Sequence, residues 1–351
     1  MSEWRYIAAF AEHFARCGLT DGEVVALLSE SQSRQDLVET ARLAAQSLGG
    51  RIFDVVVPTP VSQHPVPIRS TGASQALAGN PAVIAALSSA GLVIDCTVEG
   101  LLHAPELAAI LDAGARVLMI SNEHPDIFER LGWDPDLPRR VGVAHEWLRN
   151  AREMRVTSEA GTNLSVELTG AFTAGSTGAT AGAGSIAHWP GGLVIAFPAE
   201  NTVNGRLVMA AGDLNLTFNR IVESPIELTI VDDHIVEIGG GGVDAQLFRS
   251  YLASFGDRSS FATSHVGWGM NEAARWEAVE LYDRRETWGT EARAVAGNFL
   301  YSTGANEVAG RFTAGHFDLP MRHCTVALDG TPVVVGGELV AALSNVRDAK
   351  Q

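Results

Sequence analysis

The chain has 351 residues, of which 46% are hydrophobic and 19% are charged, a composition typical of folded globular proteins. Asp and Glu total 41 against 25 Lys and Arg, so the formal net charge is −16. A negative field of this size repels phosphate backbones and anionic lipid headgroups. We therefore expect no nucleic acid and no membrane surface as a partner, and the length predicts two domains at about 150 residues each.

The start of the chain and its cysteines indicate a cytoplasmic protein. No apolar run approaches the ~18 residues that a membrane-spanning helix needs. The opening sequence MSEWRYIAAFAEHFARC lacks the basic start and the unbroken apolar block of a signal peptide. Cys17, Cys96 and Cys324 are odd in number and widely spaced, which predicts neither a disulfide framework nor a zinc ribbon. We expect them to be unreactive core thiols.

Residues 1–150 alternate helical and strand patterns. Helical spacing over 4–17, 36–48, 82–89 and 105–113 is interleaved with the apolar runs VVALL, FDVVV, LVIDC and RVLMI. Such runs predict strands buried on both faces, and hence an α/β domain with an open, Rossmann-like parallel sheet. Ligands of such sheets bind beyond the carboxyl ends of the strands.

Residues 151–351 show a different pattern. Period-two alternation separated by Gly, Asn and Asp predicts antiparallel strands in the segments MRVTSEAGTNLSVEL, GGLVIAF, GRLVMAAGDLNL and SPIELTIVDDHIVEI. Residues 243–255 have helical spacing, and an Asp-Gly turn joins two strand-like runs near the end of the chain. We expect an α+β second domain. The run TAGSTGATAGAGSI at 173–186 is almost wholly small, and predicts a mobile loop.

Several well-known catalytic motifs are missing. The chain has no GxGxxG at the first strand-helix turn and no GxxxxGK[ST]. The sequence therefore predicts neither a dinucleotide-binding site nor a P-loop, since both need such a glycine-rich loop to hold phosphate groups. It also lacks the GxSxG of serine hydrolases.

The most specific chemical pattern is Gly315-His316-Phe317-Asp318. In an extended segment the side chains of residues i and i+2 point to the same face, so His316 and Asp318 would lie side by side as two metal ligands. His265, in SHVGWG, is a candidate third ligand, because its glycines allow close backbone approach around a small site. Two histidines and one carboxylate form the facial triad of non-haem Fe(II) oxygenases.

His103, in a loop after a predicted strand, and His188, just after the small-residue run, are candidate acid-base groups. Imidazole is the side chain that titrates nearest neutral pH. A histidine that merely donates to a backbone carbonyl is the alternative for each.

These motifs resemble the 2,5-dihydroxypyridine 5,6-dioxygenases of bacterial nicotinate and nicotine breakdown. The resemblance extends over most of the chain and rests on five segments in one order, which are LLHAPE, HWPGG, SHVGWG, GNFLYSTGAN and GHFDLPMRHC. It implies a mononuclear Fe(II) site at His265, His316 and Asp318, with His103 and His188 near the substrate. It also implies cleavage of the C5–C6 bond to give N-formylmaleamate, and a homo-oligomer.

The second half also resembles metallo-aminopeptidases of the aminopeptidase T type. In those enzymes a Pro-x-Gly-Glu stretch supplies a carboxylate to a two-metal centre, whereas this chain has Leu193 at the position of the acid. Leucine cannot ligate a metal, which favours the dioxygenase over a Zn- or Co-dependent hydrolase.

The remaining candidates concern the substrate. We expect Ser302 and Thr303 to line the pocket as hydrogen-bonding groups, and Arg322 to orient a substrate oxygen or to support the HxD strand. The dioxygenases have an acidic residue shortly before the HWP stretch, where this chain has only small residues. One acid-base partner is therefore missing at that place. A non-catalytic α/β scaffold that has kept the fold is a third hypothesis, beside the dioxygenase and the hydrolase.

Overall fold

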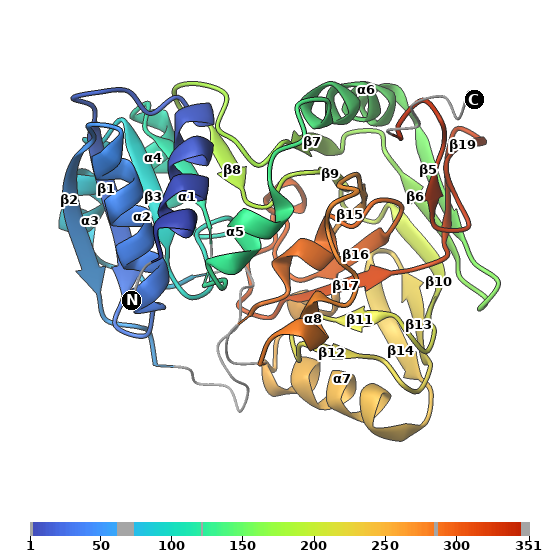
Figure 1. The fold of residues 1–351 in the computed structure, drawn as a ribbon. Helices are drawn as coiled ribbons and strands as arrows, with labels where there is room; N and C mark the ends of the chain where they lie inside the picture. Colours follow the sequence, from blue (N-terminus) through green and yellow to red (C-terminus); the bar gives the residue numbers. More distant parts are fainter. Residues whose placement is uncertain (1–2, 62–73, 121, 284–286, 345–351) are drawn as a thin grey trace, which may run out of the picture.

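The computed structural model describes residues 3–61, 74–120, 122–283 and 287–344. A parallel sheet with its helices lies on one side of the molecule, and two large antiparallel sheets and a small two-stranded one lie on the other (Figure 1). This arrangement confirms the predicted combination of an α/β and an α+β part. Among the described residues, no helix combines the length and the apolar character needed to cross a membrane.

The first sheet is parallel throughout, with the strand order β2-β1-β3-β4-β8. Its strands are β1 (Val24–Glu30), β2 (Arg51–Val57), β3 (Leu92–Cys96), β4 (Arg116–Met119) and β8 (Ile186–His188). Because β8 follows residue 150 in the chain, this sheet is not confined to residues 1–150. The division into domains at residue 150 stays a prediction.

Helices cover both faces of the first sheet. They are α1 (Trp4–Arg16), α2 (Gln35–Ser47), α3 (Pro81–Ser88), α4 (Leu107–Asp112) and α5 (Asp126–Leu131). The helix α6 (Leu137–Asn150) packs instead on the antiparallel side. Val25 and Leu27 of β1 pack in the cluster that contains α1 and α2, while Ala26 and Leu28 pack in the cluster with α3 and α4. The strand β2 departs from the prediction that these strands are buried on both faces, because it is an edge strand whose Val56 is 66% exposed.

The large antiparallel sheet has eight strands in the order β14-β13-β10-β6-β5-β18-β19-β20. These are β5 (Glu153–Thr157), β6 (Asn163–Glu167), β10 (Val203–Met209), β13 (Ile226–Val231), β14 (His234–Gly239), β18 (Thr325–Leu328), β19 (Thr331–Val335) and β20 (Glu338–Leu339). The helix α7 (Gly242–Ser254) follows β14, close to the prediction of 243–255.

A second antiparallel sheet, the inner sheet, lies between the large sheet and the first sheet (Figure 1). It has the order β17-β16-β15-β9-β7 and consists of β7 (Phe172–Ser176), β9 (Leu193–Phe197), β15 (Thr263–Gly269), β16 (Phe299–Thr303) and β17 (Phe317–Met321). The short elements are β11 (Leu214–Asn215), β12 (Arg220–Ile221), α8 (Ala278–Leu281) and the 3-10 turns η1 (Arg258–Phe261), η2 (Thr290–Arg293) and η3 (Glu307–Ala309).

Alternation along the inner strands gives this sheet two different faces. On β9, Val194 and Ala196 belong to the cluster of buried side chains from both large antiparallel sheets, which we call the main core. Leu193, Ile195 and Phe197 form a cluster on the opposite face. That opposite face looks toward the first sheet, and it carries the site described below.

The small-residue run is more ordered than the sequence predicts. Its first residues belong to β7, which pairs with β9, so a loop over the whole of 173–186 is wrong. The run packs closely against the backbone after Pro190. A Cβ on Gly178, within the run, would lie 2.6 Å from the amide nitrogen of Gly191, and a Cβ on Gly191 would lie 2.0 Å from the carbonyl carbon and oxygen of Thr177. The segment between β7 and β8 therefore passes directly against the backbone that follows His188.

Candidate active site

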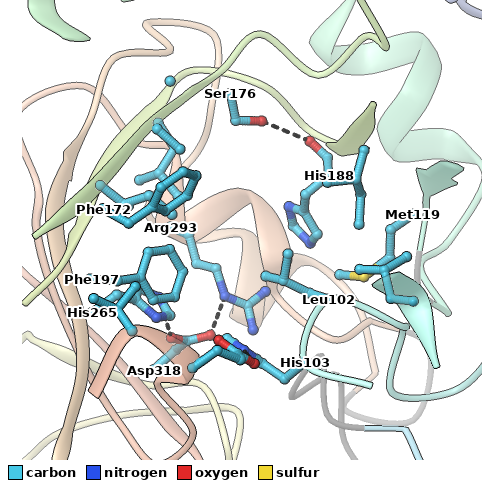
Figure 2. Close-up of a pocket in the computed structure, with 18 of the residues that line it drawn as sticks. Leu102, His103, Met119, Phe172, Ser176, His188, Phe197, His265, Arg293 and Asp318 are labelled. Atoms are coloured by element: carbon cyan, nitrogen blue, oxygen red, sulfur yellow. Dashed lines mark hydrogen bonds and ion pairs between the residues drawn. The ribbon is translucent and has the colours of Figure 1, made fainter. Parts of the chain in front are cut away.

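A cavity of about 480 Å³ lies between the first sheet and the inner sheet (Figure 2). This volume falls within the range of about 300–1,000 Å³ that is usual for small-molecule sites. Its wall is mainly apolar, with a few polar groups that converge on the interior. The described lining residues are Leu102, His103, Leu107, Met119, Phe172, Ala174, Gly175, Ser176, Ile186, His188, Leu193, Ile195, Phe197, His265, Arg293, Glu307, Val308, His316 and Asp318.

The first sheet contributes two histidines to the cavity. His188 is the last residue of β8, and His103 lies in the turn that follows β3. Both are at the carboxyl ends of parallel strands, where open α/β sheets bind ligands. The structure therefore brings both predicted acid-base candidates to one cavity.

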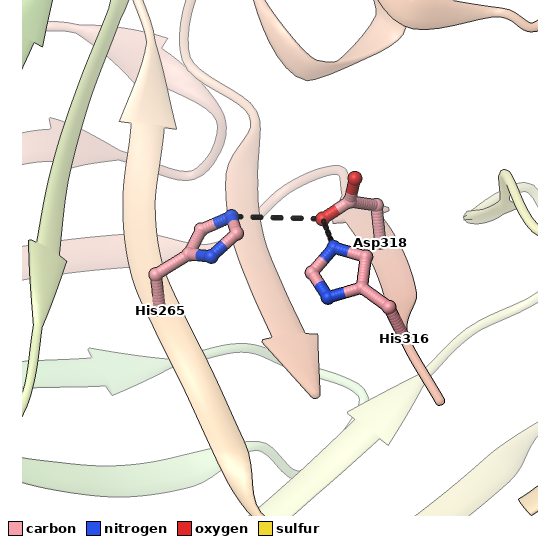
Figure 3. A group of neighbouring side chains, drawn as sticks. All are labelled: His265, His316 and Asp318. Carbon is pink, nitrogen blue, oxygen red and sulfur yellow. Dashed lines mark ion pairs between the residues drawn. The ribbon is translucent and has the colours of Figure 1, made fainter. Parts of the chain in front are cut away.

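The inner sheet contributes His265, His316 and Asp318 (Figure 3). Phe317 belongs to the main core, so the alternation of an extended chain turns His316 and Asp318 to the cavity face. His265 lies on β15 where the register with β16 shifts, between Thr263 and Val266. Such irregularities re-aim side chains, and they are common beside active sites.

The three side chains fit a metal ion by position and by chemistry. Nε2 of His265 and Nε2 of His316 lie 3.6 and 3.3 Å from Oδ1 of Asp318, and the three ligand atoms are all within 4.8 Å of one another. Two ligands that each lie about 2.1 Å from one ion are about 3 Å apart when they are adjacent. The Oγ of Ser264 lies 3.0 Å from Nδ1 of His265, which leaves Nε2 directed at the site.

Burial and charge set the protonation of the three side chains. Burial lowers the pKa of His265 well below its usual value, and it also lowers the pKa of His316. Burial raises the pKa of Asp318, but Arg293 and the two imidazoles outweigh it and hold that pKa well below the usual range. The result is two neutral imidazoles and one carboxylate, which are the forms that bind a metal.

Arg293 is a cavity residue that the sequence did not single out. It is the last residue of the turn η2, and its Nε donates to Oδ2 of Asp318. The guanidinium lies beside the carboxylate in Figure 2. It therefore holds one oxygen of Asp318 while the histidines approach the other.

Glu307 is a second residue that sequence reasoning missed. Its Oε1 lies 3.3 Å from Nδ1 of His103, whose side chain is almost fully buried. Nε2 of His103 is buried and has no hydrogen-bond partner in the described structure. With Nδ1 on Glu307, the other nitrogen is available to a bound substrate.

His188 lies across the cavity from His265, His316 and Asp318, which we call the metal-ligand group (Figure 2). Burial, followed by the charge of Arg293, lowers its pKa to about 3, so the imidazole is neutral near pH 7. Its backbone carbonyl accepts from Oγ of Ser176 at 3.3 Å. This hydrogen bond links β7 to the end of β8.

The three candidate substrate groups lie in different places. Oγ of Ser302 donates to Oδ1 of Asp318, and Oγ1 of Thr303 accepts from the amide of Phe317. Arg322 lines a separate cavity together with Asp213, and its guanidinium stacks on Trp276. The described lining of the central cavity includes none of the three, and only Ser302 touches the metal-ligand group.

Comparison with known proteins identifies the family of the chain. The sequence model of 2,5-dihydroxypyridine 5,6-dioxygenase matches residues 5–341. The chain is also 36% identical over 337 residues to the 2,5-dihydroxypyridine 5,6-dioxygenase of Pseudomonas putida KT2440, covering 94% of this chain and 95% of that one. The chain belongs to the 2,5-dihydroxypyridine 5,6-dioxygenase family.

Solved structures extend the comparison. The structure of 2,5-dihydroxypyridine dioxygenase from Pseudomonas putida KT2440 superposes with a TM-score of 0.88 at 34% identity, covering 96% of this chain and 97% of that one. Wild-type AmpT from Thermus thermophilus superposes with a TM-score of 0.60 at 14% identity, covering 96% and 99%, and this likeness concerns the fold alone.

Membership of the dioxygenase family confirms the predicted enzyme class and decides against the peptidase alternative. Leu193, the residue that replaces the acid of the peptidase motif, forms part of the apolar cavity wall. Among the described residues, the group that can hold a metal consists of His265, His316 and Asp318.

Proposed function

We propose that this chain is an Fe(II)-dependent dioxygenase that opens the C5–C6 bond of 2,5-dihydroxypyridine to give N-formylmaleamate. The observation that carries the proposal is a buried group of two imidazoles and one carboxylate at an apolar cavity, in a member of this family. Three protein ligands leave positions open for O2 and for a further ligand.

The reaction adds both atoms of one O2 to the ring and releases only a proton, from the carboxylic acid that forms. The C5–C6 bond breaks, C5 becomes the carboxylate carbon and C6 becomes the N-formyl carbon, with both oxygen atoms kept in the product. Fe(II) held by His265, His316 and Asp318 would supply the one-electron chemistry that ground-state O2 requires. The side chains of the cavity remove the substrate proton, position the substrate and exclude water.

His103 is the residue that we propose as the base. Glu307 accepts from its Nδ1–H, so Nε2 carries the lone pair that accepts the proton of the substrate 5-hydroxyl. Removal of that proton makes the ring more electron-rich and more reactive toward O2. A carboxylate that fixes a histidine tautomer and its orientation serves the same purpose in hydrolytic triads.

His188 holds the substrate from the opposite side. A neutral imidazole accepts a hydrogen bond without placing a positive charge in the cavity, and the lowered pKa of His188 keeps it in that form. The 2- and 5-hydroxyls are para to each other, so the substrate cannot chelate a single ion through both. Positioning therefore depends on His103, His188 and the apolar wall.

The apolar wall fits a flat ring. The ring of Phe197 packs against His265 and His103, with centroid separations of 5.1 and 6.1 Å. Leu193 and Ile195 extend the same surface along β9. Enclosure by these side chains excludes water, which strengthens the electrostatic interactions inside the cavity.

Oxygen consumption tests the activity. The protein, reconstituted anaerobically with Fe(II) and ascorbate, is mixed with aerated 2,5-dihydroxypyridine, and labelled O2 is followed into the product. We expect both labelled atoms in N-formylmaleamate and no release from an aminoacyl anilide with Zn(II) or Co(II). Anilide cleavage without O2 uptake would instead favour the hydrolase.

Metal analysis tests the ligands. We expect His265→Ala, His316→Ala and Asp318→Ala to lose Fe(II) and turnover together, while His188→Ala keeps Fe(II) and loses rate. A His316→Ala protein that stays fully loaded would contradict the assignment.

A homo-oligomer and a cytoplasmic location remain proposals from the sequence, and light scattering in solution tests the former.

A further inference from the structure

Glu123, outside the cavity, is a fully buried carboxylate in the loop after β4 of the first sheet. One of its oxygens accepts from Oγ1 of Thr287 at 2.8 Å and from the amide of Trp288 at 3.1 Å. The other accepts from the amide of Thr290 at 2.7 Å and from the hydroxyl of the same residue. All the donors belong to the segment that leads into and begins η2.

A second buried carboxylate fastens the same turn to the first sheet. Glu291 of η2 pairs with Arg130 of α5, and its other oxygen accepts from the amide of Arg275 at 2.7 Å. The side chain of Glu291 has no exposed surface. The turn is thus fixed to the first-sheet side of the molecule at two places.

The end of η2 reaches the metal-ligand group. Arg293, three residues after Thr290, donates to Oδ2 of Asp318 on β17. The path from Glu123 to Asp318 therefore runs through one short turn and one side chain. The same turn joins the part of the molecule that carries His103 and His188 to the sheet that carries the metal ligands.

We propose that Glu123 is a positioning residue, which fixes η2 so that Arg293 presents the Asp318 carboxylate to the metal. The inference rests on the proposed metal site. Four donors on one buried carboxylate hold a turn more rigidly than a single contact would. Partners that orient a metal ligand typically change metal affinity about 10- to 100-fold when they are removed.

Glu123→Gln is the direct test. The replacement keeps the shape but turns one acceptor oxygen into an NH2 group, which then faces the donors of Thr290 or those of Thr287 and Trp288. Asp244→Asn is the matched control, because Asp244 is a buried carboxylate on α7 that accepts from the amides of Glu223 and Ser224. Both variants lose one buried carboxylate, but Asp244 holds the segment that contains Arg220, Glu223 and Ser224, whereas Glu123 holds the turn that carries Arg293.

Co(II) titration of the metal-free proteins, followed by visible absorption, reports the metal site without catalysis. We expect Glu123→Gln to bind Co(II) at least about tenfold more weakly and with altered bands. Asp244→Asn should bind as the unmodified protein does, even if it loses as much thermal stability. In a background of Arg293→Met, Glu123→Gln should add little, since a residue that acts through Arg293 has nothing left to position.

Unchanged Co(II) binding in Glu123→Gln, or effects that simply add to those of Arg293→Met, would overturn the inference. Thr290→Val covers the case in which Glu123→Gln does not fold, because it removes one donor and keeps the carboxylate. It should show the same spectral change at smaller size, and unchanged bands would count against the inference. If the unmodified protein and His316→Ala bind Co(II) alike, the proposed metal site is wrong. That outcome is distinct from a failure of the inference on Glu123 alone.

Discussion

Nε of Arg293 donates to Oδ2 of Asp318, while the two imidazoles approach Oδ1 of the same carboxylate. The two oxygens of Asp318 therefore face different partners: Oδ2 faces the guanidinium, while Oδ1 faces the two imidazoles and accepts from Oγ of Ser302. The positive charge of Arg293 also keeps the carboxylate ionised, which burial alone would oppose. The proposed metal ligand and its charged partner thus come from two segments that the sequence separates by 25 residues.

Replacing Arg293 with Met should weaken metal binding by about 10- to 100-fold. Without the cation, burial raises the pKa of Asp318, and protons then compete with the metal at higher pH. The pH at which Co(II) is lost on acidification should therefore move upward, while Arg293→Lys should restore part of the difference. An unchanged pH midpoint for Arg293→Met would show that the guanidinium does not control this carboxylate.

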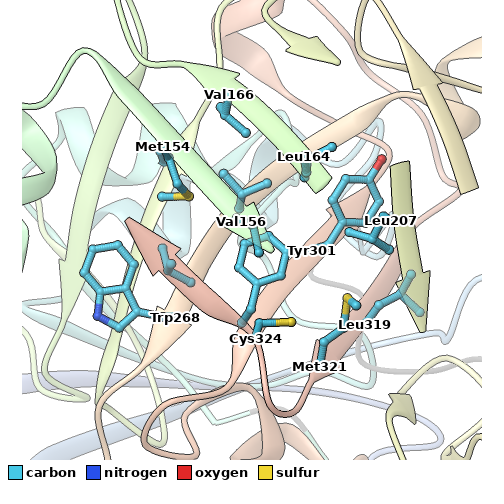
Figure 4. Packing of buried hydrophobic residues seen from close by; sticks show 14 of the residues in the cluster. Met154, Val156, Leu164, Val166, Leu207, Trp268, Tyr301, Leu319, Met321 and Cys324 are labelled. Atoms are coloured by element: carbon cyan, nitrogen blue, oxygen red, sulfur yellow. The ribbon is translucent and has the colours of Figure 1, made fainter. Parts of the chain in front are cut away.

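Short-range periodicity was enough to predict the pairing of His316 with Asp318. On β17 the intervening Phe317 packs in the main core. The alternate residues Leu319 and Met321 pack there too (Figure 4). A strand with apolar residues on one face must turn the alternate positions to the other face. The same rule gives the two faces of β9, so most of the strands could be predicted from local pattern.

The rest of the site could not be predicted from local patterns, because it depends on contacts between segments that are distant in the chain. Arg293 and Glu307 lie on 3-10 turns, which have no hydrophobic period, and their partners are distant in the chain. β8 joins the first sheet from beyond residue 150, a pairing between segments that no local pattern reports. Arg322 lies close to the HxD motif in sequence, but its side chain points to a different cavity. Proximity in sequence was a poor guide where a strand ends and the chain turns.

Glu307→Ala should reduce kcat with little loss of metal, because the carboxylate touches His103 and not the metal-ligand group. Without that acceptor the imidazole is free to rotate or to place its proton on Nε2. We expect a loss of at least about tenfold in kcat. Glu307→Gln keeps an amide oxygen as acceptor and should recover part of the rate.

Metal content measured on the same preparations separates the explanations. A Glu307→Ala protein with full activity would mean that His103 needs no orienting partner. A protein that loses Fe(II) in proportion to its activity would make the role of Glu307 structural.

Gly191→Ala should displace the backbone next to His188. The added Cβ would meet the carbonyl group of Thr177 at 2.0 Å, and neither segment has a flexible side chain that can yield. We expect a loss of about 1–3 kcal/mol in the free energy of unfolding. The rate should fall further than the metal content, since His188 moves while the metal ligands on the inner sheet stay in place.

Gly182→Ala is the matched control for that substitution. It lies in the small-residue run against which Gly191 packs, but an added Cβ there meets nothing within 4 Å. Stability and rate should stay close to those of the unmodified protein. Equal losses in the two variants would mean that an added methyl group is damaging throughout this part of the chain, and not only at the contact between Gly191 and Thr177.

His13 should make the stability of the protein depend on pH in weakly acidic solution. Burial lowers its pKa from 6.5 to about 4, although its ring nitrogen contacts the carbonyl oxygen of Gly178 at 2.8 Å. The unfolded chain therefore binds a proton between pH 6.5 and 4 that the folded chain does not, so stability falls as the pH drops through this window. His13→Gln keeps a donor for the carbonyl and removes the titration. Between pH 7 and 5 the variant should lose about 2 kcal/mol less in urea-unfolding free energy than the unmodified protein. His234→Gln controls for the loss of an imidazole from a less buried position, and equal pH dependence in all three proteins would contradict a neutral, buried His13.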